Sequence, residues 1–172
     1  MQLKMFGKKS LSTILFYSTR LITIGYGIFL ILIIISLISN NFIITETNDI
    51  QIKIPFTNSV IKGDYSLKTL IGILCFLIFY ASFFYTLSLI FKTFGAEKLF
   101  TEEAIKYLKR FTILNLILPV AYILIGAIIN SSITPDDVVP GLLHIGLGIF
   151  SWFIAAIFTL GFTIQEENEL TI

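Results

Sequence analysis

Near-continuous apolar runs separated by short polar segments dominate the pattern of this chain. Four runs are each close to the length that an α-helix needs to cross a bilayer, about 20 residues at ~1.5 Å of rise per residue. They cover residues 21–44, 70–91, 111–129 and 142–164. The runs lack the alternation of a water-facing element. The pattern therefore predicts an all-α membrane protein: one domain, 1–172, in which four transmembrane helices form an antiparallel bundle.

The outer loop, residues 45–69, carries a different period. The run Ile50-Gln51-Ile52-Lys53-Ile54 alternates apolar and polar side chains, as a half-buried strand does. Val60-Ile61 supplies a second short apolar piece. We therefore expect a small extracytoplasmic β-hairpin, which would rest on the helix ends because a lone hairpin is marginal in water.

Two further segments carry helix-start signals. In the inner loop, residues 92–110, Thr101 precedes Glu102 and Glu103, so a capped helix should begin there and continue into the third span. The sequence from Thr134 to Asp137 predicts a second helix start. The pair Pro140-Gly141 should interrupt that helix before the fourth span.

Composition supports a membrane protein. Hydrophobic residues make up 56% of the 172 residues and charged residues 13%, about half the charged fraction of a soluble domain. Mean hydropathy is +0.92. The net charge of +1 supplies no field to attract nucleic acid, so we expect no direct nucleic-acid binding. The one cysteine cannot form an internal disulfide or a thiolate cluster.

The distribution of basic residues predicts the sidedness. Four of the twelve precede the first span and five lie between the second and third spans. The first outer loop holds three, and the loop before the fourth span holds none. Basic residues resist translocation, so both termini should face the cytoplasm.

The spans offer little chemistry. None of the four runs contains Asp, Glu, Lys or Arg, which counts against an ion-coupled transporter or a voltage sensor. No nucleotide-binding, metalloprotease or serine-hydrolase motif is present. We therefore expect no enzyme, no cofactor, no metal site and no catalytic residue.

Polar side chains at similar depth suggest a layer near the inner face. The candidates are Tyr26, Tyr85, Asn115 and Thr159. Pro119 lies one turn after Asn115 and should bend the third span, because its ring removes a backbone hydrogen bond. Interhelical hydrogen bonding is the favoured interpretation. A ligand or lipid pocket is the alternative.

The fourth span carries three other signals. His144 is the one histidine, and we expect an interfacial side chain without a special role rather than a pH sensor or a metal ligand. Small residues should mark helix contacts, at Gly146, Gly148, Ser151 and Ala155 in this span and at Gly25 and Gly27 in the first span. Trp152, near the middle of the run, should pack against a neighbouring helix.

Two motifs carry a family resemblance. The first is Glu97-Lys98-Leu99-Phe100-Thr101-Glu102-Glu103, followed by a basic helix and an apolar span, and the second is the ending Gln165-Glu166-Glu167-Asn168-Glu169-Leu170-Thr171-Ile172. Together they resemble the bacterial membrane proteins catalogued as domain of unknown function two-nine-seven-five, which share four spans and a closing Glu-Asn-Asp-Leu-Thr-Val/Ile. Glu169 replaces the usual aspartate. The resemblance implies the bacterial inner membrane and carries no established activity. Its members are often encoded beside small helix-turn-helix regulators.

The acidic ending has its own physical interpretation. Acids after a helix carboxyl end are unfavourable to the helix dipole, so they would pair better with basic residues on the same side. This predicts a cytoplasmic contact face made of Glu102, Lys106, Lys109, Arg110, Glu166, Glu167 and Glu169. In that arrangement Leu170 and Ile172 would pack back on the bundle. A frayed, solvated tail is the alternative.

These observations favour a non-catalytic membrane protein that binds a protein partner, such as a helix-turn-helix regulator, at its cytoplasmic face. The alternative is a transport or permeation component for a small or apolar solute. A homo-oligomer is compatible with the small-residue positions. The lipid bilayer is a partner in either case.

Overall fold

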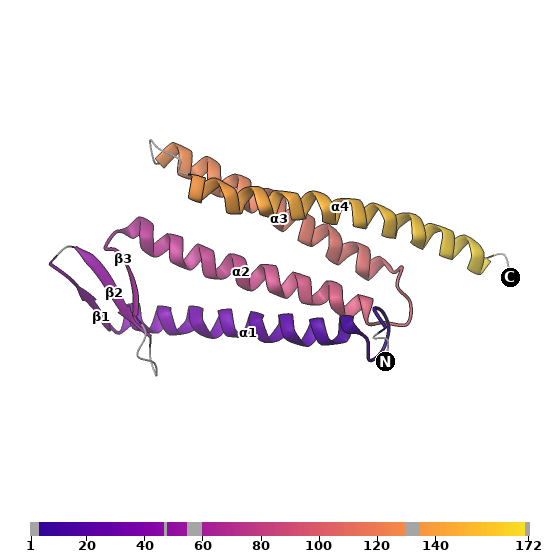
Figure 1. The fold of residues 1–172 in the computed structure, drawn as a ribbon, viewed down its shortest axis with the longest axis horizontal. Coiled ribbons are helices and arrows are strands. Elements are labelled where there is room, and N and C mark those ends of the chain that lie inside the picture. Colours follow the sequence, from indigo (N-terminus) through magenta and orange to yellow (C-terminus); the bar gives the residue numbers. More distant parts are fainter. Residues whose placement is uncertain (1–3, 47, 55–59, 130–134, 171–172) are drawn as a thin grey trace. The chain divides into compact units, whose positions relative to one another are not determined.

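The computed structural model describes residues 4–46, 48–54, 60–129 and 135–170. The described part contains four helices, α1 (Leu11–Ile38), α2 (Leu67–Phe94), α3 (Glu102–Ile129) and α4 (Pro135–Leu170), and three strands, β1 (Phe42–Ile44), β2 (Asp49–Lys53) and β3 (Val60–Asp64) (Figure 1). Each helix contains a segment long and apolar enough to cross a membrane. The predicted class, a membrane protein of four helices with a small β element, is confirmed.

The chain divides into two compact units, which are described separately. The sheet unit is Thr19–Tyr85, and the hairpin unit is Met1–Ser18 with Thr86–Ile172. The sheet unit thus holds most of α1 and α2 with the strands, and the hairpin unit holds α3 and α4. A bundle of all four helices stays a prediction.

The sheet is antiparallel with the order β1-β2-β3. The hairpin expected from the alternating pattern is present as β2 and β3, in which Ile52 pairs with Ile61. Ile50 and Ile52 are fully buried, as a period of two requires. Pro55, which follows this run, lies outside the described residues.

The strand β1 was not predicted, because its residues complete the apolar run 21–44. The helix stops earlier, at a left-handed Asn40 with φ of 51°. The Asn41 amide donates to the Ser36 carbonyl at 2.9 Å and the Asn40 amide to Leu37 at 3.3 Å. This is a Schellman ending, for which asparagine is the usual substitute for glycine. The apolar residues after it pair with β2 instead of extending the span.

The start of α1 also differs from the predicted span. The helix begins at Leu11, so Arg20 lies within it rather than before it. The Arg20 guanidinium carbon lies 4.7 Å from the centre of the Tyr85 ring. A guanidinium stacks favourably on an aromatic face, which offsets part of the cost of a charge in an apolar helix.

In the hairpin unit, α3 begins as the sequence predicts. The Ala104 amide donates to Thr101 Oγ1 at 3.2 Å, and Glu102 and Glu103 occupy the first turn. By contrast, α4 is continuous through Pro140 and Gly141, so the predicted interruption is wrong. Pro140 lies only five residues after the helix start and removes a single early backbone bond. Thr134, the expected cap, lies outside the described residues.

Close approach of backbones defines the antiparallel contact of α3 with α4. A Cβ atom on Gly148 would lie 2.8 Å from Leu116 Cγ and 3.3 Å from the Asn115 carbonyl carbon. A Cβ atom on Gly141 would lie 2.6 Å from Ile123 Cδ1. The face of α4 beyond Gly148 is also buried, at Ser151, Ala155 and Phe158. Small residues let these two helices pack closely.

Not every predicted small-residue contact exists. Gly148, Ser151 and Ala155 are buried in the interface, whereas a Cβ atom on Gly146, Gly25 or Gly27 would meet no atom within 4 Å. The difference on α4 follows from helix geometry. Gly141 and Gly148 are seven residues apart, two full turns, and therefore share one face that Gly146 does not.

The same contacts fix the register of α4 along α3. The Ser151 hydroxyl donates to the Leu108 carbonyl at 3.2 Å. Nearer the carboxyl end, a Cβ atom on Gly161 would lie 2.6 Å from the Phe100 ring. Because α3 begins at Glu102, the last part of α4 extends past the start of α3 (Figure 1).

Candidate functional site

A buried polar pair joins the middle of α3 to α4. Asn115 is fully buried, and its Oδ1 lies 2.8 Å from Nδ1 of His144. Its amide nitrogen donates to the Phe111 carbonyl at 2.8 Å. The amide oxygen is therefore the acceptor for His144, which places the imidazole proton on Nδ1. His144, expected to have no special role, is the partner that satisfies Asn115.

The other predicted members of the polar layer have different surroundings. Thr159 is exposed and donates to the carbonyl of Ala155 in its own helix, at 2.8 Å. In the sheet unit, Tyr26 stacks on the rings of Tyr80 and Phe84 with centroids 5.8 Å away in both cases, and Tyr85 lies under Arg20. Within the hairpin unit, Asn115 therefore forms its interhelical hydrogen bond with His144 and not with Thr159. Because Asn115 lies opposite His144, Thr159 lies at a different level of the hairpin and does not belong to a layer with Asn115. The place of Tyr26 and Tyr85 relative to Asn115 stays a prediction.

Pro119 is buried on the same side of α3 as Asn115. The helix continues through it to Ile129. A Cβ atom on Gly141 would lie 3.9 Å from Pro119 Cβ, so the proline ring packs where α4 has no side chain. A bend at Pro119 stays a prediction.

A second cluster lies at the end of the hairpin unit where α3 begins. The Gly7 amide donates to the Phe94 carbonyl at 3.0 Å, and Lys8 forms an ion pair with Glu97 at 2.7 Å. Lys98 forms an ion pair with Glu169 at 2.7 Å. The N-terminal segment, the connection from α2 to α3 and the end of α4 thus meet at one place, which we call the charged end.

The predicted contact face lies at or beside this charged end, and all seven of its residues are exposed: Glu102, Lys106, Lys109, Arg110, Glu166, Glu167 and Glu169. The expected pairing of the tail with Lys106, Lys109 or Arg110 is not what Glu169 shows, since its partner is Lys98. The tail is also not a separate segment, because α4 continues to Leu170. Leu170 is 87% exposed and does not pack back, and Ile172 lies outside the described residues.

Large apolar side chains are exposed along the same stretch of α4. Phe153, Ile157, Leu160 and Ile164 are spaced by four, three and four residues, so they share one face. Because Ser151 contacts Leu108 and Gly161 approaches Phe100, Phe153 and Ile157 lie level with the charged first turns of α3. Leu160 and Ile164 lie at and beyond the start of α3. We call these four residues the apolar stripe. Sequence reasoning missed it because these residues belong to the predicted fourth span.

The Trp152 side chain lies in a different environment from the one predicted. The side chain is 63% exposed rather than packed on a neighbouring helix. It follows Ser151, so it lies level with Leu108 and with the basic residues on either side of it, Lys106, Lys109 and Arg110. Tryptophan and basic side chains both favour the boundary between lipid and water.

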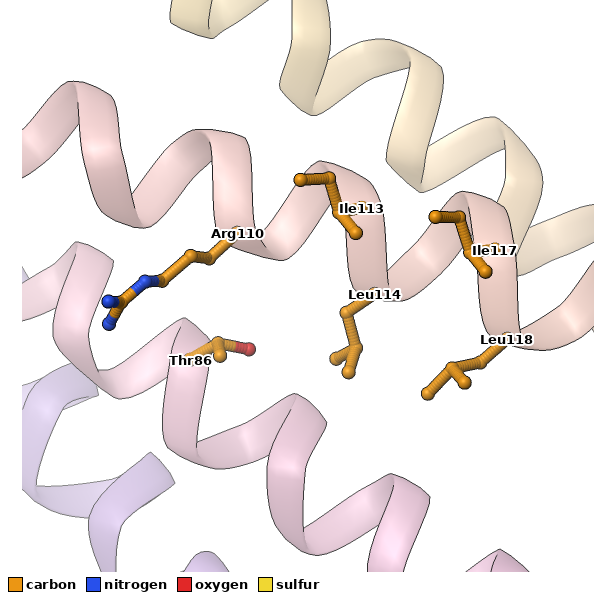
Figure 2. A pocket seen from close by; sticks show the side chains of 6 residues that line it. All are labelled: Thr86, Arg110, Ile113, Leu114, Ile117 and Leu118. Carbon is orange, nitrogen blue, oxygen red and sulfur yellow. The ribbon is translucent and has the colours of Figure 1, made fainter.

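A shallow groove of about 360 Å³ runs along α3. Its lining consists of Thr86, Arg110, Ile113, Leu114, Ile117 and Leu118. Figure 2 shows Arg110 and Thr86 at one end, with the four apolar side chains following along the helix. The groove is therefore apolar except at the end that carries the guanidinium and the hydroxyl.

Among the residues that the structure describes, no three His, Cys, Asp or Glu side chains gather in a geometry that could hold a metal ion.

Comparison with known proteins identifies a family. A family model described as a protein of unknown function, DUF2975, matches residues 23–172. No curated protein and no solved structure matches the chain. The match covers most of the sequence and agrees with the resemblance that the two motifs carry, so the chain belongs to the DUF2975 family.

Proposed function

We propose that this member of the DUF2975 family is a non-catalytic inner-membrane protein with both termini in the cytoplasm, which binds another protein through its charged end and apolar stripe. The two motifs that carry the resemblance are the connection before α3 and the end of α4. They meet in the charged end through Lys98 and Glu169.

The observation that carries the proposal is the exposed apolar stripe beside exposed charges. If the membrane surface lies level with Trp152, residues 153–170 extend ~27 Å beyond it at ~1.5 Å per residue. The apolar stripe would then face water rather than lipid. A contiguous apolar surface bordered by charges is typical of a protein–protein contact.

The charges suit a partner of mixed charge. Lys106 and Lys109 on α3 and Glu166 and Glu167 on α4 offer both signs. Such a pattern favours a partner whose charges are arranged in a complementary way, and it speeds the association of the two proteins. The finer proposal, that the partner is a small helix-turn-helix regulator, rests on the family resemblance alone.

The sidedness is supported by the same contacts. The N-terminal segment, the connection from α2 to α3 and the end of α4 meet in one unit, which fits an even number of crossings. Their basic residues favour the cytoplasmic side. A reporter protein fused after Ile172 should be active in the cytoplasm, and export of that reporter would contradict the topology.

Photocrosslinking in intact cells tests the proposal. A photoreactive phenylalanine replaces Leu160, in the apolar stripe, or Leu143, a matched leucine of the same helix near its other end. The two are exposed to 63% and 67%, so accessibility alone does not distinguish them. We expect a protein adduct from position 160 and none from position 143.

The same crosslinking experiment tests the role of the charged side chains beside the apolar stripe. The double variant Lys106→Glu with Lys109→Glu, combined with the crosslinker at position 160, should lose most of the adduct. Mass spectrometry of the adduct then identifies the partner, and a helix-turn-helix protein would support the finer proposal. Lipid adducts alone at both positions would mean that the apolar stripe lies in the bilayer, and the proposal would fail.

A further inference from the structure

We propose that the groove on α3 is a binding site for one anionic phospholipid, with the phosphate at Arg110 and an acyl chain along Ile113, Leu114, Ile117 and Leu118. The groove is not part of the protein-binding surface proposed above, so the inference goes beyond that function. It assigns a ligand class to a site that the sequence left as a general alternative.

The shape of the groove fits a lipid because its polarity changes along its length. Arg110 and Thr86 form one end, and the remaining lining is entirely apolar (Figure 2). From Arg110 to Leu118 the helix rises ~12 Å, at ~1.5 Å per residue. An acyl chain that follows this path would descend through about four fifths of one leaflet, because the hydrocarbon layer of both leaflets together is ~30 Å thick.

The depth of the groove suits a headgroup at Arg110. Ser151 bonds to Leu108, so Trp152 lies within about one turn of Arg110 along the hairpin. An exposed tryptophan beside basic residues marks the level at which lipid headgroups lie. The apolar lining then points into the hydrocarbon, where an acyl chain belongs.

The chemistry of Arg110 favours an anionic phosphate over a neutral headgroup. A guanidinium offers its donors in a planar fork that matches two phosphate oxygens. A zwitterionic lipid brings its own cation to this point, which Arg110 would repel.

Native mass spectrometry of the purified full chain tests the site. The protein in detergent is titrated with phosphatidylglycerol or with phosphatidylcholine of the same acyl chains, and the bound fraction is measured for each lipid. We expect the wild-type chain to retain phosphatidylglycerol preferentially. Arg110→Gln should lower its retention about fivefold, the usual effect of one basic residue at an anionic membrane surface.

Lys109→Gln is the matched control. It removes the same charge one position away, from a side chain outside the groove lining, and should retain phosphatidylglycerol like the wild type. Leu114→Trp fills the groove while keeping Arg110, and should lower the retention of both lipids. Equal losses in Arg110→Gln and Lys109→Gln would mean diffuse attraction and would overturn the proposal.

Two further outcomes would overturn parts of the proposed lipid site. Full retention of phosphatidylglycerol by a folded Leu114→Trp variant would overturn the acyl-chain path. An equal loss of both lipids in Arg110→Gln would overturn the assignment of the phosphate. If circular dichroism shows that Leu114→Trp does not fold, the pair Arg110→Gln and Lys109→Gln decides alone.

Discussion

The α3–α4 pair of the hairpin unit packs through small residues, whereas the α1–α2 pair of the sheet unit packs through large aromatic ones. In the hairpin unit, glycines at 141 and 148 leave no room for a methyl group between the helices. In the sheet unit, Tyr26 of α1 meets Tyr80 and Phe84 of α2 through stacked rings, while Gly25 and Gly27 face open space. One contact depends on missing side chains and the other on large ones.

The difference shows that glycine in an apolar helix is not by itself a contact signal. Where two helices approach closely, dispersion attraction and the burial of Asn115 depend on the absence of a Cβ atom. Where rings fill the space between helices, a nearby glycine has no structural role.

Replacing Gly148 with alanine should destabilise the hairpin by ~1–3 kcal/mol, because the new methyl group meets Leu116 and the Asn115 backbone. Gly146→Ala is the matched control in the same helix. It has open space and should gain up to ~1 kcal/mol from helix propensity. Denaturant titration in micelles, followed by circular dichroism, measures both. Shifts of the same sign would refute the close-packing account.

Replacing Tyr26 with alanine should cost the sheet unit ~0.5–1.5 kcal/mol, since both ring contacts are lost. Tyr26→Phe keeps the ring and should retain most of the stability. Amide hydrogen exchange within α1 and α2 reports the local effect. An equal loss of stability in both variants would show that the hydroxyl group, and not the ring, makes the stabilising contact.

A double-mutant cycle measures the pair at the centre of the hairpin. Asn115→Ala and His144→Ala should couple by about 0.6 kcal/mol, the average for hydrogen bonds between membrane helices. The measurement is the unfolding free energy of the two single variants and the double variant in the same micelles. Additive losses, with no coupling, would mean that the hydrogen bond contributes nothing beyond the packing of each side chain.

The smallest effect is expected at the charged end. Lys98→Gln removes the ion pair with Glu169, whose side chains are 64% and 56% exposed, so water and salt already screen the attraction. The unfolding midpoint should stay unchanged. Hydrogen exchange in the last turn of α4 should rise slightly at low salt and not at high salt. A clear loss of global stability would show that the charged end supports the hairpin itself.

The sequence predicts the elements better than their register. The four helices follow from run length, the start of α3 from Thr101, and two of the strands from the alternation at Ile50 and Ile52. The third strand was hidden in an apolar run, because hydrophobicity does not distinguish the end of a helix from a following strand. The pair Asn40-Asn41 was the local signal that could have revealed it.

The polar site was harder to predict because it depends on how far one helix slides along another. Counting depth from the edges of the apolar runs pairs Asn115 with Thr159. The structure pairs it with His144, fifteen residues earlier and ~22 Å away along a helix. Contacts of Gly148 and Gly161 set this register, and run edges do not report such contacts.

The length of α4 has a mechanical consequence. The helix has 36 residues, or ~54 Å at ~1.5 Å per residue, against a hydrocarbon layer of ~30 Å. A single stiff rod therefore carries Gly148 within the helix pair and Glu169 at its tip. Tilting or twisting the tip would shift the glycine against Leu116 without any flexible joint to absorb the motion. A displacement of the exposed tip of α4 would thereby be carried along the helix to the contact of Gly148 with Leu116.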